Sequence, residues 1–326
     1  MKKVIGIGNA LVDLLIRLEN DQLLSELDIK KGSMQLIDKD FKNKIFDKTV
    51  HLSKSQASGG SAANTIHGLA SLGSQTAFIG TVGDDTLGKF FTSDLTSNNI
   101  RPILKLSANE TGVASTLIST DSERTFGTYL GAAVEVEPED VNTNLLKDYD
   151  IFHIEGYLVF NEALVEKTLV TAKENNMTVS LDLASFNVVE AKLDFLQKIT
   201  QKYVDIVFAN EEEAKAFTGK DPETALNEIS EICKVAVIKV GKNGSLIKSG
   251  NNKVQVGAIP AKVIDTTGAG DLYAAGYLYG FSHGLSLEKC GKIGALLAGN
   301  VIEVIGAKIP VNKWEQIKAI VNDIEK

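Results

Sequence analysis

Residues 265–271, DTTGAGD, lead directly into residues 272–279, LYAAGYLY, which we predict to form a helix. A glycine-rich turn before a helix points free backbone N–H groups and the positive end of the helix dipole at one place. Gly268 and Gly270 allow the backbone to approach a ligand closely and to take positive φ angles, and Ala269 adds almost no bulk. This stretch therefore predicts an anion-binding site at the start of the helix.

Asp271 ends the turn, where it would lie beside a bound anion, well placed to accept a proton. Aspartate is also a favoured helix N-cap, so an isolated Asp at this position could simply cap the helix. A cap alone requires neither Gly268 nor Gly270, and we therefore favour a proton acceptor.

The composition is that of an ordinary globular chain of 326 residues, with 44% hydrophobic and 23% charged residues. The formal net charge of -8 argues against a nucleic-acid partner. Cys233 and Cys290 lack close-spaced metal-ligand partners, which disfavours a zinc site or a disulfide framework. The apolar stretch near the N-terminus is too short for a signal peptide, and no apolar run reaches membrane-spanning length, so we expect a soluble cytoplasmic protein without a membrane partner. We expect a monomer or a homodimer.

The chain after residue 150 alternates between two periodicities. Apolar runs at 151–155, 178–183, 204–209 and 235–240 are separated by segments with helical spacing, which is the βαβ pattern of a parallel sheet. Residues 163–173 and 314–324 both carry an apolar helical face, and we expect the two helices to cover one face of that sheet.

The first part of the chain contains short β-like segments that are not separated by predicted helices. They form two clusters, one within residues 12–54 and one within residues 99–131. We predict that these two insertions build a small β-sheet lid, and that residues 1–11, 55–98 and 132–326 build the α/β core.

Residues 265–278 resemble the second signature of the PfkB carbohydrate kinase family, also called the ribokinase-like family. The resemblance implies a three-layer α/β/α core with a mostly parallel sheet, plus a small β-sheet lid. It implies an ATP- and Mg²⁺-dependent kinase that phosphorylates a hydroxyl group of a sugar or nucleoside. Asp271 would be the catalytic base, and the amides of Gly268, Ala269 and Gly270 would form an anion hole for the γ-phosphate.

Two N-terminal motifs resemble the substrate-binding segments of the same family. SGGSAAN at 58–64 resembles the Gly-Gly-x-x-x-Asn segment, which implies that Gly59, Gly60 and Asn64 bind substrate hydroxyls; a tight turn before a helix is the structural alternative. GNALVD at 8–13 resembles the opening motif, which implies substrate-binding roles for Asn9 and Asp13.

A vicinal diol has two O–H donors, which suit the two carboxylate oxygens of Asp13. The alternative is that Asp13 is an ordinary loop carboxylate.

Two further motifs resemble the nucleotide-binding segments. NEEE at 210–213 implies Asn210 near the phosphates and Glu213 arranging Mg²⁺ through water, although an N-cap followed by acidic residues would look the same. KVGKNGS at 239–245 resembles the nucleotide-binding strand and turn, with nucleotide-binding roles for Lys239, Gly241 and Gly244; a plain β-hairpin would look similar.

The family also implies a monovalent cation, usually K⁺, behind the anion hole. Its ligands here would include Asp265 and Thr267, with others in a C-terminal segment near Gly306.

Other nucleotide-binding folds do not match. A Rossmann fingerprint that starts at Gly6 would need its third glycine at Leu11, and no P-loop motif occurs in the sequence. A non-enzymatic nucleoside or sugar sensor on the kinase fold is the alternative from another functional class, and the intact Asp271 argues against it.

The segments KGSMQLID at 31–38 and ERTFGTYLGA at 123–132 resemble the adenosine-kinase-like branch of the family. That branch phosphorylates a ribose 5′-hydroxyl, which favours an adenosine-like nucleoside; a sugar or sugar phosphate is the alternative. The lid offers apolar residues for a purine base, namely Met34, Leu36 and Phe126; the alternative is that Met34 and Phe126 fill the core of the lid itself. Arg124 could contact substrate phosphate or support the lid.

Overall fold

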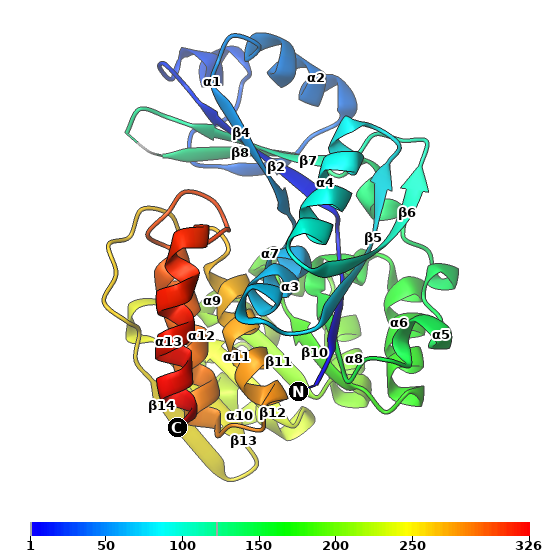
Figure 1. Cartoon of the computed structure of the whole chain (residues 1–326), viewed down its shortest axis with the longest axis vertical. Helices are drawn as coiled ribbons and strands as arrows, with labels where there is room; N and C mark the ends of the chain where they lie inside the picture. Colours follow the sequence, from blue (N-terminus) through cyan, green and yellow to red (C-terminus); the bar gives the residue numbers. More distant parts are fainter. Residues whose placement is uncertain (1, 122) are drawn as a thin grey trace.

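The chain builds one large and one small β-sheet, as the computed structural model shows for residues 2–121 and 123–326 (Figure 1). The large sheet has the order β14-β13-β12-β11-β10-β9-β1-β5-β6. Its strands pair in parallel from β12 to β6, and β13 and β14 are antiparallel. The strands are β1 (Val4–Ile7), β5 (Thr76–Gly83), β6 (Ile100–Ser107), β9 (Ile151–Glu155), β10 (Thr178–Asp182), β11 (Ile206–Asn210), β12 (Val235–Lys239), β13 (Ser245–Ser249) and β14 (Asn252–Val256).

The central strands of the large sheet are buried on both faces. In β11, Ile206 and Phe208 belong to one hydrophobic core, while Val207 and Ala209 belong to the core on the opposite face. This alternation follows from the two-residue period of a strand, and it explains why these segments are continuous apolar runs in the sequence.

Helices cover both faces and complete three layers, which confirms the predicted fold class. One core contains residues of α3 (Ser61–Leu72), α4 (Thr86–Ser97), α11 (Ala269–Ser282), α12 (Leu287–Val301) and α13 (Trp314–Glu325). The other contains residues of α5 (Thr143–Leu146), α6 (Glu162–Glu174), α7 (Phe186–Ala191), α8 (Leu193–Tyr203), α9 (Glu211–Thr218) and α10 (Pro222–Ile232).

Helices α6 and α13 lie on opposite faces of the sheet, so the prediction that they share a face was wrong. An apolar stripe shows only that a helix is covered on one side, and the direction of the chain connections decides which face of the sheet covers it.

The small sheet has the order β3-β8-β7-β2-β4 and lies at the top of the view in Figure 1. Its strands are β2 (Leu11–Arg17), β3 (Met34–Leu36), β4 (Lys54–Gly59), β7 (Gly112–Ile118) and β8 (Arg124–Tyr129). Two helices, α1 (Gln22–Glu26) and α2 (Lys39–Lys48), accompany it, and a separate core including Ile16, Ile45 and Leu117 lies beneath them. Five short 3₁₀ helices also occur in the described residues: Gly131–Glu135, Pro138–Asp140, Gly156–Phe160, Gly241–Asn243 and Val311–Lys313.

Two details of the predicted lid were wrong. Strand β6 pairs in parallel with β5 in the large sheet, so residues 100–107 do not belong to the small one. Helix α4 between them makes the crossover that a parallel pair requires. The N-terminal insertion also contains two helices, α1 and α2, and the N-cap of α2, Asp38, accepts a hydrogen bond from the amide of Phe41.

In the described part of the chain, no helix combines the length and the hydropathy that a membrane span requires.

Candidate active site

The N-terminus of α11 has the geometry of an anion site. Its N-cap, Gly268, has a φ of 74°, and a Cβ atom there would lie 2.5 Å from Cβ of Ala307, so both the backbone angle and the space require glycine. Among the described residues, nothing accepts a hydrogen bond from the amides of Gly268, Gly270 and Asp271, whereas Ala269 N donates to Thr266 O at 3.2 Å. Three free N–H groups therefore gather at the positive end of the helix.

The carboxylate of Asp271 is held by two side chains of α3. Ser61 Oγ donates to Oδ1 at 2.7 Å, and Asn64 Nδ2 donates to Oδ2 at 3.0 Å. Thr65 Oγ1 also donates to the backbone oxygen of Asp271 at 3.1 Å. Burial, together with the negative charge of Asp182, raises the pKa of Asp271 to about 6, although the hydrogen bonds from Asn64 and Ser61 oppose this rise. The carboxylate is thus oriented, and it is mostly ionised at neutral pH.

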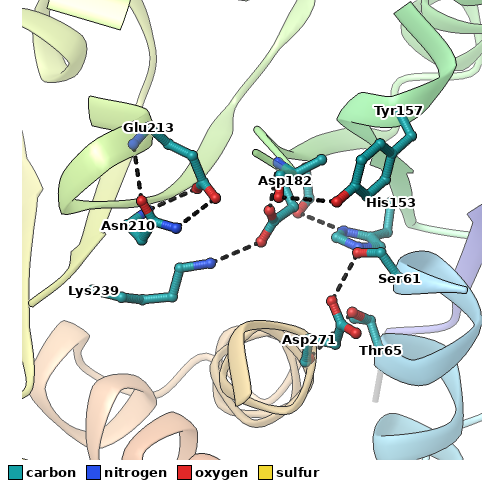
Figure 2. A network of polar contacts seen from close by, with 11 residues as sticks. Ser61, Thr65, His153, Tyr157, Asp182, Asn210, Glu213, Lys239 and Asp271 are labelled. Carbon is teal, nitrogen blue, oxygen red and sulfur yellow. Dashed lines mark hydrogen bonds and ion pairs between the residues drawn. The ribbon is translucent and has the colours of Figure 1, made fainter. Parts of the chain in front are cut away.

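The carboxyl ends of four adjacent strands bring polar side chains to the same edge of the sheet. Strands β9, β10, β11 and β12 end with Glu155, Asp182, Asn210 and Lys239. Nζ of Lys239 lies 3.0 Å from Oδ2 of Asp182, and Figure 2 shows this pair between the Asn210 cluster and Asp271. A Cβ atom on Gly270 would lie 3.0 Å from Nζ of Lys239. A buried ammonium group therefore adjoins the turn before α11.

Lys239 keeps its charge despite this position. Burial alone would lower the pKa of Lys239, but Asp182 and Glu213 outweigh burial and raise it.

Asn210 and Glu213 form a capping box at the start of α9. Asn210 Oδ1 accepts from the amide of Glu213 at 2.8 Å, and Glu213 accepts from the amide and the side chain of Asn210 at 2.8 and 2.6 Å. Burial raises the pKa of Glu213 to about 7, with opposing effects from Lys239 and Asp182. The capping alternative considered for this motif is thus realised, and a role toward Mg²⁺ remains a prediction.

Asp13 and Asn64 present two unused acceptor groups. Burial raises the pKa of Asp13 to about 7, although Lys308 lowers it, and no described residue donates a hydrogen bond to this carboxylate. Oδ1 of Asn64 is buried and likewise lacks a donor among the described residues. A ligand with hydroxyl donors would satisfy both groups.

Gly59 and Gly60 form the backbone segment next to Asp13. A Cβ atom on Gly59 would lie 2.3 Å from Oδ1 of Asp13, and Gly60, with a φ of 98°, caps α3. The turn-and-helix alternative therefore also describes this segment correctly.

The side chain of Asn9, a predicted substrate-binding residue, points toward Glu155. Its amide and its side-chain Nδ2 both donate to Oε1 of Glu155, at 2.8 and 2.7 Å, and Oε2 accepts from the amide of Ala62 at 2.8 Å. Burial raises the pKa of Glu155 to about 7, against the effect of these hydrogen bonds. Glu155 therefore links the end of β1 to the first turn of α3.

Arg124 is the first residue of β8, and its side chain contacts the loop before α11. It forms an ion pair with Asp265, donates to Thr267 Oγ1 at 3.2 Å and donates to Ile264 O at 3.1 Å. The predicted substrate residue Arg124 thus contacts both predicted cation ligands.

Gly241 and Gly244 form the turn between β12 and β13, which is an antiparallel hairpin as the structural alternative proposed. Their φ angles are 52° and 89°. Both positions require a left-handed backbone, so the hairpin alone explains these glycines.

Sequence reasoning missed four polar groups near Asp271: Glu155, Asp182, Ser61 and Lys308. Glu155 ends the predicted strand 151–155, and Asp182 is the penultimate residue of the predicted strand 178–183; this position is the signal that could have identified them. Nζ of Lys308 is buried without a hydrogen-bond partner among the described residues. Burial lowers the pKa of Lys308 to about 8, and the charges of Asp94 and Asp13 oppose this fall.

Comparison with known proteins identifies the family. The profile of pfkB family carbohydrate kinases matches residues 33–314. The chain belongs to the PfkB family. A probable sugar kinase from Rhizobium etli is 36% identical, with a TM-score of 0.88 and 98% of each chain covered. Adenosine kinase from Sinorhizobium meliloti is 35% identical, with a TM-score of 0.87 and 99% of each chain covered. A 5-dehydro-2-deoxygluconokinase from Geobacillus thermodenitrificans is 29% identical over 82% of this chain and 85% of its own.

This PfkB protein is therefore a phosphotransferase with a hydroxyl group as acceptor, which confirms the predicted enzyme class. Kinases of this family use ATP, generally with Mg²⁺.

Proposed function

We propose that this PfkB kinase transfers the γ-phosphoryl group of ATP to a ribose hydroxyl of an adenosine-like nucleoside, with Asp271 as the catalytic base. The observation that carries the proposal is the position of Asp271. Its carboxylate follows a turn with free amides and is oriented by Ser61 and Asn64. A hydroxyl held against this carboxylate would have its proton acceptor and a phosphate-binding turn on adjacent residues.

In the proposed reaction, Asp271 removes the proton as the substrate oxygen bonds to the γ-phosphorus and the bond to the β-phosphate oxygen breaks. The products are the phosphorylated substrate and ADP, and the proton is on Asp271. Phosphoryl transfer has a loose transition state, so catalysis depends mainly on positioning and electrostatics. The free amides of Gly268, Gly270 and Asp271 suit the charge on the γ-phosphate.

Lys239 and Glu213 are the charged residues that we propose for the nucleotide-binding part of the site. The ammonium group of Lys239 adjoins Gly270 and suits a phosphate oxygen. Glu213 is a carboxylate whose pKa is raised mainly by burial, and such a group suits a hydrated Mg²⁺. When bound, Mg²⁺ would offset the charge of the ATP phosphates. Asn210 would orient Glu213, and the turn at Gly241 and Gly244 would border the nucleotide.

Asp13 and Asn64 are the proposed ribose ligands. Each offers an acceptor that no described residue uses, and two adjacent hydroxyl groups offer two donors. Because Asn64 also donates to Asp271, a ribose held by Asn64 would lie close to the base.

The small sheet offers an apolar surface on the side of Asp13. Asp13 lies opposite Ala114, Ala114 lies opposite Thr128, and Thr128 lies opposite Leu36. Residues opposite each other in paired strands share a face of the sheet, as do residues two apart in one strand. Leu36 and Met34 therefore share the face of Asp13.

Exposure supports a ligand-facing role for these residues. Met34 is 67% exposed and Leu36 is 73% exposed, so neither fills the core of the small sheet, and the core-filling alternative was wrong for Met34. Half-buried Phe126 lies opposite Met34. A purine base would cover such a surface, whereas a bare sugar would leave it in water.

A sugar phosphate remains the alternative substrate class, because curated relatives include sugar kinases. A second phosphate would need a basic residue on the lid side. Arg124 is engaged by Asp265 and Thr267, which disfavours this alternative.

We also propose that the small sheet acts as a lid over the site, with residues 12–54 and 112–131 as its moving parts. Asp13 and Arg124 come from this sheet and reach toward the core, which supports closure over a bound substrate.

A coupled ADP-release screen tests the substrate class. Nucleosides, free sugars and sugar phosphates would be compared at equal concentration with ATP and Mg²⁺. We expect adenosine or a related nucleoside to give the highest kcat/KM. A dominant sugar or sugar phosphate, with inert nucleosides, would overturn the nucleoside assignment and leave the kinase class intact.

A further inference from the structure

Arg124 connects the small sheet to the loop before α11. The side chains of Arg124 and Asp265 are only 10% and 1% exposed. Besides its ion pair with Asp265, Arg124 donates through Nη1 to Thr267 Oγ1 and through Nη2 to Ile264 O. The guanidinium group is thus surrounded by three acceptors from residues 264–267.

Asp265 has no free oxygen in this arrangement. Oδ1 accepts from the amide of Thr267 at 2.7 Å and pairs with Arg124, while Oδ2 accepts from the amide of Gly306 at 2.5 Å. The same carboxylate therefore joins the loop before α11, the C-terminal segment at Gly306 and the small sheet.

These contacts conflict with the monovalent cation that the family resemblance implied. A K⁺ ion would need oxygen atoms of Asp265 and Thr267 that face the ion, but both carboxylate oxygens of Asp265 and the hydroxyl oxygen of Thr267 already accept hydrogen bonds from the chain. A second positive charge beside the guanidinium would also be repelled in this poorly solvated place. The residues that are present do not fit a bound K⁺ ion.

We propose that the guanidinium group of Arg124 replaces the monovalent cation, so that the enzyme works without K⁺. Arginine suits this position because it is always charged and its planar fork can bind several oxygens at once. A buried carboxylate such as Asp265 needs a positive partner, and Arg124 supplies that charge from within the chain. Arg124 is thereby a positioning residue that acts on phosphate transfer through the loop at 265–268.

Arg124 lies on β8, in the small sheet. Its ion pair with Asp265 therefore makes the geometry of the anion-binding turn depend on the placement of the small sheet. A cation from solution would bind the turn without this dependence.

The test compares the wild type with Arg124→Met, Arg124→Lys and the control Arg17→Met. Arg17 lies exposed at the end of β2 in the same sheet, and its side chain forms no ion pair within the described residues. Each protein would be assayed with ATP and its best acceptor in K⁺ and in tetramethylammonium at equal ionic strength. Thermal unfolding would be measured in the same two buffers without substrate.

For wild type, Arg124→Lys and Arg17→Met, we expect each protein to have the same kcat and the same Tm in K⁺ as in tetramethylammonium. Arg124→Lys, which keeps the charge but loses the planar fork, should have a lower kcat than wild type in both buffers. Arg124→Met should lose about 10²-fold in kcat in tetramethylammonium, the cost of a misplaced reacting group. K⁺ or free guanidinium ion should restore part of the lost kcat of Arg124→Met. Either ion should also raise the Tm of this variant and of no other protein in the comparison.

A wild-type Tm or kcat that depends on K⁺ would overturn the proposal, and so would an Arg124→Met protein as active as wild type in both buffers. If Arg124→Met does not fold, the wild-type and Arg124→Lys comparisons still decide. The activity arm rests on the proposed kinase reaction, whereas the unfolding arm does not, so failures of the two proposals can be distinguished.

Discussion

Nδ2 of Asn64 lies 3.0 Å from Oδ2 of Asp271, although 207 residues separate the two in the sequence. The contact joins the first turn of α3 to the first turn of α11. Close packing of the two helices fixes it, because a Cβ atom on Gly68 of α3 would lie 2.7 Å from Cβ of Ala275 in α11. The proposed substrate ligand and the proposed base therefore have a set separation.

Asp13→Asn should weaken substrate binding more than turnover. An amide forms weaker hydrogen bonds with a diol than a carboxylate does, and hydrogen bonds to charged groups contribute about 1.5–3 kcal/mol. We expect kcat/KM to fall by about one to two orders of magnitude, mainly through KM. Asp40→Asn, an exposed carboxylate in α2, is the matched control. An unchanged KM in Asp13→Asn would remove Asp13 from the substrate site.

The pH dependence of kcat/KM should reflect the raised carboxylate pKa values. An aspartate must be ionised to accept a proton, and the pKa of Asp271 is about 6, so activity should fall as pH decreases through 6. Ionised Asp13, with a pKa of about 7, should add a shallower loss that starts at higher pH. Activity that stays constant down to pH 5 would contradict these protonation states.

Gly268→Ala should impair catalysis beyond its effect on the backbone. Gly219, the C-cap of α9, has the same φ of 74°, but no described atom lies within 4 Å of the place that its Cβ atom would take, which makes Gly219→Ala a matched control. Both substitutions carry a left-handed backbone cost of roughly 1–2 kcal/mol. Only Gly268→Ala also meets Ala307, and we expect only this variant to lose about 10²-fold in kcat. Equal kcat values in the two variants would argue against the anion turn.

Hydrogen exchange should show closure of the small sheet. Addition of substrate should slow exchange in β2, β3, β7 and β8, because a closed lid excludes water. Strand β6 provides the internal control, since it belongs to the large sheet and should show no comparable change. Equal exchange with and without substrate in the small sheet would contradict the lid.

Much of the core could be predicted because its signals are local. The apolar runs that became β9 to β12 are almost entirely buried strands, and the glycines at 268 and 270 mark a turn that only small residues fit. The same local signal did not show which sheet receives β6, because pairing with β5 depends on the crossover through α4.

The polar cluster was harder to predict, because it is assembled from strand ends far apart in the chain. Asp182 and Glu155 look like ordinary strand-terminal residues until the parallel order places them beside Lys239 and Asn9. The pairing of Arg124 with Asp265 likewise depends on the placement of the small sheet. The cytoplasmic location and the oligomeric state remain predictions from the sequence.

Asp271→Asn tests the central claim most directly. The variant should fold, as judged by Tm, and should bind ATP, because the amides of the turn are unchanged and Asn can still accept from Ser61. An amide cannot take the hydroxyl proton, so kcat should fall by roughly 10²–10⁴-fold, the range of a general base. Turnover near the wild-type rate, measured with the best acceptor at saturating ATP, would contradict the assignment of Asp271 as the base.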